Sequence, residues 1–151
     1  MVGSELAAPP LVSHDTFRRW VVPYAKELIQ LVHSYDKKVI QHFHGQIYDL
    51  LPDFLDMSPD ALHTIEAPPI GNCTLEQAFD IVGDRMTLVG NIQYDDFRSF
   101  TPEKMKQTVR SMRRRFAGKR LIISPTAGPF DPEPPPRLNE NYHALLDGAF
   151  D

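Results

Sequence analysis

The chain has 151 residues, of which 42% are apolar and 24% are charged, and its formal net charge is −4. These totals are ordinary for a single soluble globular domain, and they argue against a broadly basic nucleic-acid-binding surface and against disorder throughout the chain. No apolar run approaches the roughly 20 residues that a membrane-spanning helix needs. The single cysteine, Cys73, cannot form an internal disulfide and the amino terminus has no secretory pattern, so we expect a cytoplasmic protein.

The spacing of apolar residues predicts helices and strands that alternate along the chain. Ser13 is a candidate N-cap for two leading helical pieces within 14–35, which Pro23 separates. Later helix starts are indicated by the capping-box pattern Thr74-Leu75-Glu76-Gln77 and by Thr101-Pro102-Glu103. The predicted strands cover 38–42, 61–66, 85–92 and 121–124, and the helices between and after them cover 47–57, 74–82, 101–118 and 139–150.

Four strands that are each followed by a helical pattern predict repeated βα units and a parallel sheet, in the α/β class. A complete TIM-type (β/α)8 barrel takes about 250 residues, so the prediction is a parallel (βα)4 half-barrel. We expect a single domain over 1–151, with leading helices in 1–37, a strand–helix core in 38–128, and a proline-rich segment and terminal helix in 129–151. Two open sheet edges predict a second half-barrel or self-association as partner.

Two histidines at the end of the first predicted strand indicate a metal site. His42 and His44 are two residues apart, so both imidazoles point to the same face of a strand. Glu66 closes the next predicted strand and would lie beside them if the two strands are parallel neighbours. The sequence therefore predicts a His42/His44/Glu66 site for a divalent metal, with polar filling of a barrel lumen as the alternative.

Amide side chains follow on the third predicted strand. Asn91 and Gln93 alternate onto one face, where they could orient a substrate through hydrogen bonds. The alternative for Asn91 is that it satisfies buried backbone groups near Gly90. His63 shows no partner pattern in the sequence.

The motifs quoted so far, together with the segments Val89-Gly90-Asn91-Ile92-Gln93 and Ile123-Ser124-Pro125-Thr126-Ala127-Gly128, resemble a known family. The run from Pro9 to Pro129 resembles the carboxyl-terminal half of the uroporphyrinogen decarboxylase superfamily. That superfamily includes the decarboxylase, corrinoid-dependent methyltransferases and the related barrel of cobalamin-independent methionine synthase.

The resemblance implies chemistry at the same residues. The methyltransferase branches hold zinc with His-x-Cys on one strand, often a glutamate on the next, and a cysteine at the end of the final strand. His42 matches the histidine, His44 occupies the place of the first cysteine, and Glu66 lies at the spacing of the glutamate. Ala127 or Thr126 stands in place of the last cysteine. It implies a divalent metal, zinc before manganese or iron, a methyl-corrinoid partner protein as donor, a thiol or hydroxyl substrate, and Thr126 near that substrate. The alternatives are decarboxylation of a tetrapyrrole and a non-catalytic half-barrel fragment or assembly module.

Overall fold

The structure is a computed structural model, and it describes residues 1–128 and 132–151. A five-stranded sheet runs through the middle of the molecule, with all neighbouring strands parallel and in the order β1-β2-β3-β4-β5. The strands are β1 (Val2–Gly3), β2 (Ile40–His42), β3 (Ala61–His63), β4 (Thr87–Ile92) and β5 (Leu121–Pro125).

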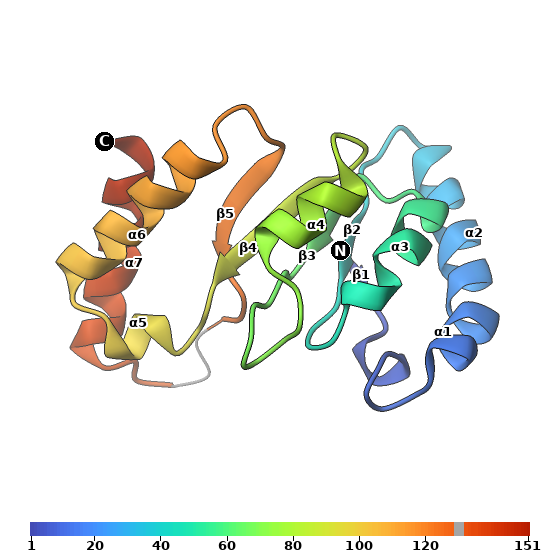
Figure 1. Cartoon of the computed structure of the whole chain (residues 1–151), viewed down its shortest axis with the longest axis horizontal. Helices are drawn as coiled ribbons and strands as arrows, with labels where there is room; N and C mark the ends of the chain where they lie inside the picture. The colour runs from blue at the N-terminus through green and yellow to red at the C-terminus, as the bar shows by residue number, and fades with distance from the viewer. Residues whose placement is uncertain (129–131) are drawn as a thin grey trace.

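Helices connect the successive strands. Two of them, α1 and α2, lie between β1 and β2, and the carboxyl-terminal helix α7 follows β5 (Figure 1). The helices are η1 (Glu5–Ala7), α1 (His14–Trp20), α2 (Val22–His33), η2 (Tyr48–Leu50), α3 (Leu51–Met57), α4 (Leu75–Val82), α5 (Asp96–Ser99), α6 (Pro102–Arg115) and α7 (Pro136–Phe150).

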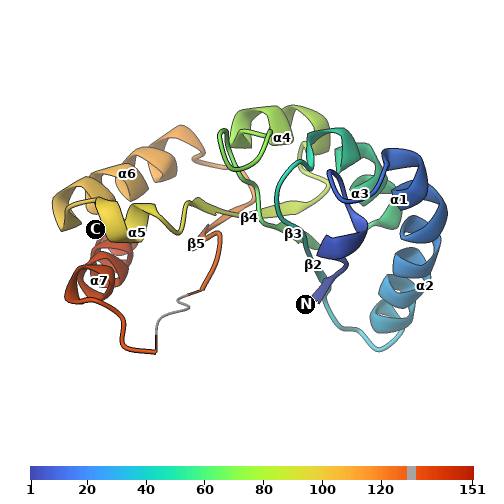
Figure 2. The same cartoon turned by 90° about the horizontal axis from the view of Figure 1, so that it is seen from below.

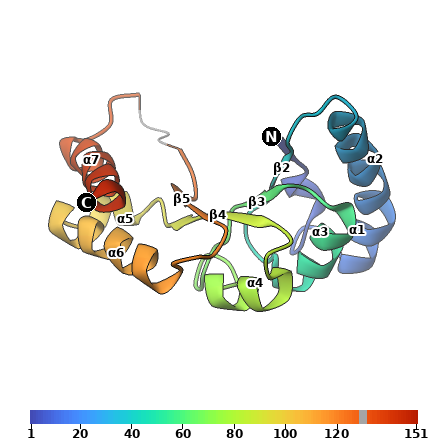
Figure 3. The ribbon, with the colours of Figure 1, turned by 90° about the horizontal axis from the view of Figure 1, so that it is seen from above.

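The sheet is curved, and the helices lie along its convex side (Figure 2). Among the described residues no helix crosses the concave side, which Figure 3 shows as the open side of an arc. The apolar core forms two clusters on the helical side. One packs the helices from α1 to α4 on the sheet around Phe17, Phe43 and Phe54, and the other packs α5, α6 and α7 around Phe97 and Val109. The molecule is therefore an open (βα) arc, the shape of part of a TIM-type barrel.

The predicted start signals act as expected at three helices. The Ser13 hydroxyl accepts a hydrogen bond from the Thr16 N–H at the start of α1, and Thr101 accepts one from Lys104 at the start of α6. Thr74 and Gln77 form both hydrogen bonds of a capping box at α4. Each of these side chains satisfies a backbone N–H that has no partner within its helix.

The structure differs from the prediction mainly in short elements. The sheet has five strands rather than four, because the two-residue strand β1 pairs with β2 through Val2 and Gly3. The four-residue helix α5 was also not predicted. The strand predicted over 61–66 ends at His63, and the final helix begins at Pro136 rather than near 139. Part of the proline-rich segment, 129–131, lies outside the described residues. Of the helices that the structure describes, none is long and apolar enough to cross a bilayer.

Candidate metal centre

Histidines from two adjacent strands meet at the carboxyl end of the sheet. The parallel register pairs His42 of β2 with His63 of β3. Their rings stack with centroids 4.8 Å apart, and their Nδ1 atoms lie 2.6 Å apart. The Nε2 atom of His63 lies 3.1 Å from the carbonyl oxygen of Pro125, at the end of β5. The two imidazoles are therefore linked in a chain of hydrogen bonds that reaches the far edge of the sheet.

This chain of hydrogen bonds determines which nitrogen of each imidazole ring carries a hydrogen atom. A carbonyl oxygen only accepts, so the Nε2 atom of His63 must donate to Pro125. Neutral His63 then accepts at Nδ1, and His42 must donate from its own Nδ1. The Nε2 atom of a neutral His42 is left with a lone pair, which points at a Glu5 carboxylate oxygen 2.8 Å away. Two lone pairs repel at this distance. A positive charge, either a proton or a metal cation, is therefore required between the His42 nitrogen and the Glu5 oxygen.

A third side chain that can bind a metal, His44, lies beside Glu5 and His42. The His44 ring stands nearly perpendicular to that of His42, with centroids 4.7 Å apart. Glu5, His42 and His44 each offer one ligand atom, and these three atoms lie within 4.8 Å of one another. Ligands of tetrahedral zinc are roughly 3.3 Å apart when each metal–ligand bond is about 2.0 to 2.1 Å. Binding would therefore draw the three atoms closer together, and two imidazole nitrogens with one carboxylate are a ligand set that divalent zinc accepts.

Glu66 lies behind His44. One of its carboxylate oxygens accepts a hydrogen bond of 2.8 Å from the Gly45 backbone N–H, and the other lies 3.2 Å from the Nδ1 atom of His44. The carboxylate is almost completely buried. With Nδ1 of His44 donating to Glu66, the Nε2 atom of that ring is the one that remains free to bind a ligand.

The protonation equilibria of these side chains follow from burial and from the carboxylates. Burial lowers the pKa of both His42 and His63. The hydrogen bond to Glu66 raises the pKa of His44 despite its partial burial. Burial opposes ionisation of Glu66, but the hydrogen bonds from His44 and Gly45 outweigh that effect, and the pKa of Glu66 lies below its ordinary value.

Two cavities border the histidines. The larger, about 510 Å³, is lined by Glu5, the three clustered histidines and the segment 124–128. The smaller, about 190 Å³, is lined by His44, Glu66, Gln93, Thr126 and Ala127, among others. Ala127 lines both cavities beside His44. The structure therefore places Gln93 and Thr126 next to the predicted metal ligands.

One side-chain hydrogen-bond donor of Gln93 lacks a partner among the described residues. Its Oε1 atom lies 3.4 Å from the Thr126 hydroxyl, whereas its Nε2 donor is buried and has no partner in the part of the chain that the structure describes. A buried donor without a partner is unfavourable, so a bound group with an acceptor atom would stabilise this site.

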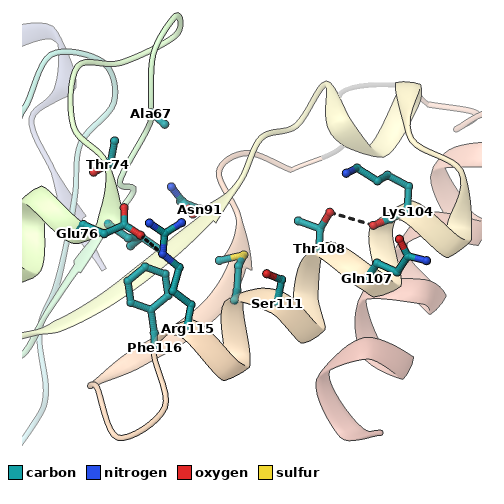
Figure 4. Close-up of a pocket in the computed structure, with 12 residues that line it drawn as sticks. Ala67, Thr74, Glu76, Asn91, Lys104, Gln107, Thr108, Ser111, Arg115 and Phe116 are labelled. Atoms are coloured by element: carbon teal, nitrogen blue, oxygen red, sulfur yellow. Dashed lines mark hydrogen bonds and ion pairs between the residues drawn. The ribbon is translucent and has the colours of Figure 1, made fainter.

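Asn91 lies elsewhere. It lines a separate cavity of about 510 Å³ between α4 and α6, close to the Arg115–Glu76 ion pair of 2.7 Å (Figure 4). Gln93 lies just beyond the end of β4 at Ile92. Asn91 and Gln93 therefore line different cavities, and of the two only Gln93 borders the histidine cluster.

The sequence pattern missed two members of the cluster, Glu5 and His63. Glu5 follows a strand too short to produce a pattern. His63 had a signal, because it ends β3 just as His42 ends β2, and parallel neighbours with matched ends place such residues side by side. Cys73 lies outside the cluster, and burial raises the pKa of its thiol to about 11.

Comparisons with known proteins agree with this architecture. The family model described as uroporphyrinogen decarboxylase (URO-D) matches residues 4–147. A solved structure titled "methyltransferase from Methanosarcina mazei" is similar with a TM-score of 0.74 and 24% sequence identity. The match covers 98% of this chain and 40% of that chain. No curated protein matches the chain. On the family match, which spans nearly all of its residues, the chain belongs to the uroporphyrinogen decarboxylase family.

Proposed function

We propose that the chain carries the metal centre of a methyltransferase. The ligands are the Nε2 atoms of His42 and His44 and the carboxylate of Glu5, and the sequence-predicted ligand Glu66 instead holds His44 in position through its Nδ1 atom. The observation that carries the proposal is the convergence of Glu5, His42 and His44, whose three ligand atoms lie within 4.8 Å of one another. Two nitrogens and one oxygen leave a fourth position open, which suits catalytic zinc, with manganese or iron also chemically acceptable.

A metal in this position would lower the pKa of a bound thiol or hydroxyl and so supply a nucleophile at neutral pH. The residues of the chain then have separate tasks. Glu66 and His63 fix the orientation of the two ligating rings, as outer-shell partners do in other metal sites. Gln93 offers its unpartnered N–H group to an acceptor atom of the substrate, and Thr126 holds the Gln93 amide. The methyl donor in this proposal is a methyl-corrinoid carried by a partner protein.

The proposed reaction also needs polypeptide beyond this segment. The chain spans 40% of the solved methyltransferase that it resembles. Its sheet has five strands, whereas a closed barrel of this type has eight. We propose that the segment works in association with a second polypeptide surface, either a further part of a barrel or a second copy of the chain.

Metal binding is tested by titrating the metal-free chain with Zn²⁺ in a calorimeter and by measuring the metal content of the purified chain. We expect one metal per chain, with binding lost in the His42→Ala/His44→Ala double variant and weakened about 10- to 100-fold in Glu66→Gln. Glu5→Gln should weaken binding more than Glu66→Gln. His143→Ala, which removes an exposed histidine on α7, is the matched control and should bind as the parent does.

Group transfer is tested with methylcobalamin and a small thiol, with or without the zinc-loaded chain. Transfer forms a C–S bond and breaks the Co–C bond, leaving its electron pair on cobalt. The cob(I)alamin absorbance should therefore rise only with the zinc-loaded chain and not with the double variant.

Two outcomes would contradict the proposal. Equal zinc affinity of Glu5→Gln and the parent would contradict the ligand set. Porphyrinogen binding that a chelator leaves unchanged would favour decarboxylation instead.

A further inference from the structure

The cavity that Asn91 lines is a crevice between α4 and α6, in the middle of the chain (Figure 4). Its walls are the start of α4 and one side of α6, and Asn91 of β4 lies between them. Strand β4 is an inner strand, so the crevice is built from consecutive βα units and does not lie at an open edge of the sheet. Its volume of about 510 Å³ lies within the range of roughly 300 to 1,000 Å³ that is typical of small-molecule sites.

The crevice lies where the two apolar clusters adjoin. Helix α4 packs in the first cluster and α6 in the second, and Met112 contacts both. Two contacts join the helices across the gap. The ring centroids of Phe79 and Phe116 are 5.5 Å apart, and Arg115 pairs with Glu76 at 2.7 Å. Ligand sites are frequent at boundaries between separately packed parts of a protein.

The side of α6 that lines the crevice is polar. Four polar or charged residues recur at intervals of four, three and four residues, on one side of the helix: Lys104, Thr108, Ser111 and Arg115. Helices that pack against each other present apolar side chains to the contact, so this side of α6 is not suited to packing on α4. Its hydroxyl groups are instead suited to a ligand with several hydrogen-bonding groups.

Asn91 brings an amide without a partner into the crevice. Its side chain is half-buried and makes no hydrogen bond within the part of the chain that the structure describes. The hydrogen bond to backbone near Gly90, which the sequence left open as an alternative, is therefore not formed among these residues. An amide offers two N–H donors and an oxygen acceptor, so Asn91 can bind a polar group in the crevice.

Arg115 places a positive charge beside this amide. Its Nε atom donates to a Glu76 carboxylate oxygen at 2.7 Å, which holds the guanidinium in position. Its two terminal nitrogens make no hydrogen bond with the described residues, and Figure 4 shows the guanidinium pointing toward Asn91. The terminal N–H groups of a guanidinium form a fork that matches the two oxygens of a carboxylate.

We propose that the crevice binds a small hydroxylated carboxylate. Arg115 and Asn91 hold its carboxylate group, and the polar side of α6 contacts its hydroxyl groups. The charges favour a ligand with one negative charge, because the charged residues that line the crevice are two cations, Lys104 and Arg115, and one anion, Glu76. A phosphate ester carries about two negative charges at neutral pH and would bring them close to Glu76.

This site is separate from the proposed metal centre. Among the described residues, none lines both the crevice and either of the cavities that border the histidines. Binding in the crevice therefore needs no metal, and it can be measured on the metal-free chain.

Titration with gluconate in the presence of a chelator, monitored through the Asn91 side-chain amide by NMR, tests the proposal. Sorbitol has the same chain of hydroxyl groups without the carboxylate, and glucose 6-phosphate carries a phosphate instead. We expect gluconate to bind more tightly than either by about 10-fold or more. Arg115→Gln should weaken gluconate binding by a similar factor, since it removes hydrogen bonds to a charged group. Arg114→Gln is the matched control, because it removes the same charge from an exposed neighbour outside the crevice.

The His42→Ala/His44→Ala double variant separates this proposal from the metal centre, because it should bind gluconate as the parent does. Circular dichroism establishes that each variant is folded. The proposal is overturned if the Asn91 amide does not respond to about 20 mM gluconate, a concentration at which even a millimolar ligand would be largely bound. Equal binding of sorbitol, tighter binding of glucose 6-phosphate, or equal effects of Arg115→Gln and Arg114→Gln would also overturn it.

Discussion

Asp60 sets the alignment of β2 and β3, and its replacement by asparagine tests how the site is positioned. The Asp60 carboxylate accepts hydrogen bonds from the Val39 N–H at 2.8 Å and from His33 at 2.8 Å, and it pairs with Lys38 at 2.9 Å. The backbone of Asp60 also bonds to Val39 and Thr87. These contacts join the amino-terminal ends of β2, β3 and β4, so they fix the register that brings His42 and His63 together at the other end.

The magnitude follows from the charge that Asp60→Asn removes. The amide keeps an oxygen for Val39, but a charged acceptor makes a hydrogen bond about twice as strong as a neutral one, which is worth about 1 kcal/mol here. The two partly exposed pairs with His33 and Lys38 add up to about 1 kcal/mol between them. We therefore expect a loss of about 2 kcal/mol of unfolding free energy at pH 7, or roughly 4 to 8 °C in Tm for a domain of this size.

The loss should depend on pH in a defined direction. Burial opposes ionisation of Asp60, but the hydrogen bonds from Val39, Lys38 and His33 prevail and depress its pKa far below the ordinary value. The stabilisation is then complete above the unfolded-state pKa of about 3.9 and disappears as the pH falls through the lower folded-state pKa. The stability difference between parent and Asp60→Asn should shrink as the pH falls below about 4.

Urea unfolding followed by circular dichroism at several pH values measures this difference. Asp56→Asn is the control, because Asp56 makes a solvent-exposed pair with Lys26 and should change stability by less than about 0.5 kcal/mol. The reasoning is refuted if Asp60→Asn and Asp56→Asn have equal effects at pH 7, or if the difference between Asp60→Asn and the parent persists unchanged below pH 3.

Three further substitutions probe local packing and capping. Thr74→Ala should cost about 1 kcal/mol in urea unfolding because the hydroxyl that accepts a hydrogen bond from the Gln77 N–H at the start of α4 is lost, and no change would contradict that role. Gly148→Ala should destabilise by about 1 to 2 kcal/mol despite the better helix propensity of alanine, since the new Cβ would lie 2.8 Å from the Lys106 carbonyl oxygen; a higher Tm would show that α6 and α7 can separate. Asn141→Leu should cost about 2 to 4 kcal/mol in thermal unfolding, because buried Asn141 donates to the Phe97 and Phe100 carbonyls, and a neutral effect would mean that water replaces it.

The sequence predicted those parts of the fold that depend on local patterns. Buried apolar runs indicated β2 to β5, and side-chain caps indicated where α1, α4 and α6 begin. Elements of two to four residues, β1 and α5, carry no period, because they form only when the neighbouring strand or helix is already present. Their prediction needs tertiary information that no local window of the sequence contains.

The same distinction applies to the site. The spacing of His42 and His44 reveals their common face, since alternation within one strand is a local property. The position of His63 depends on the register between two strands, which Asp60 helps to set from the other end of β3. Glu66 was predicted to reach the cluster as the end of a strand. It lies beside His44 from the loop after β3, where the Gly45 N–H holds its carboxylate.

The edge strand β5 affects the chemistry at Glu5 in η1 by determining which histidine nitrogens carry hydrogen. The Pro125 carbonyl requires the hydrogen of His63 on Nε2, which leaves Nδ1 of that ring as an acceptor and makes His42 donate. The lone pair that His42 presents to Glu5 thus depends on a contact between β3 and the end of β5, which is two strands away in the sheet. Without the Pro125 contact, His63 could carry its hydrogen on Nδ1, and neutral His42 could then donate from Nε2 to Glu5. The edge strand therefore takes part in the proposed metal site although it supplies none of the proposed ligands.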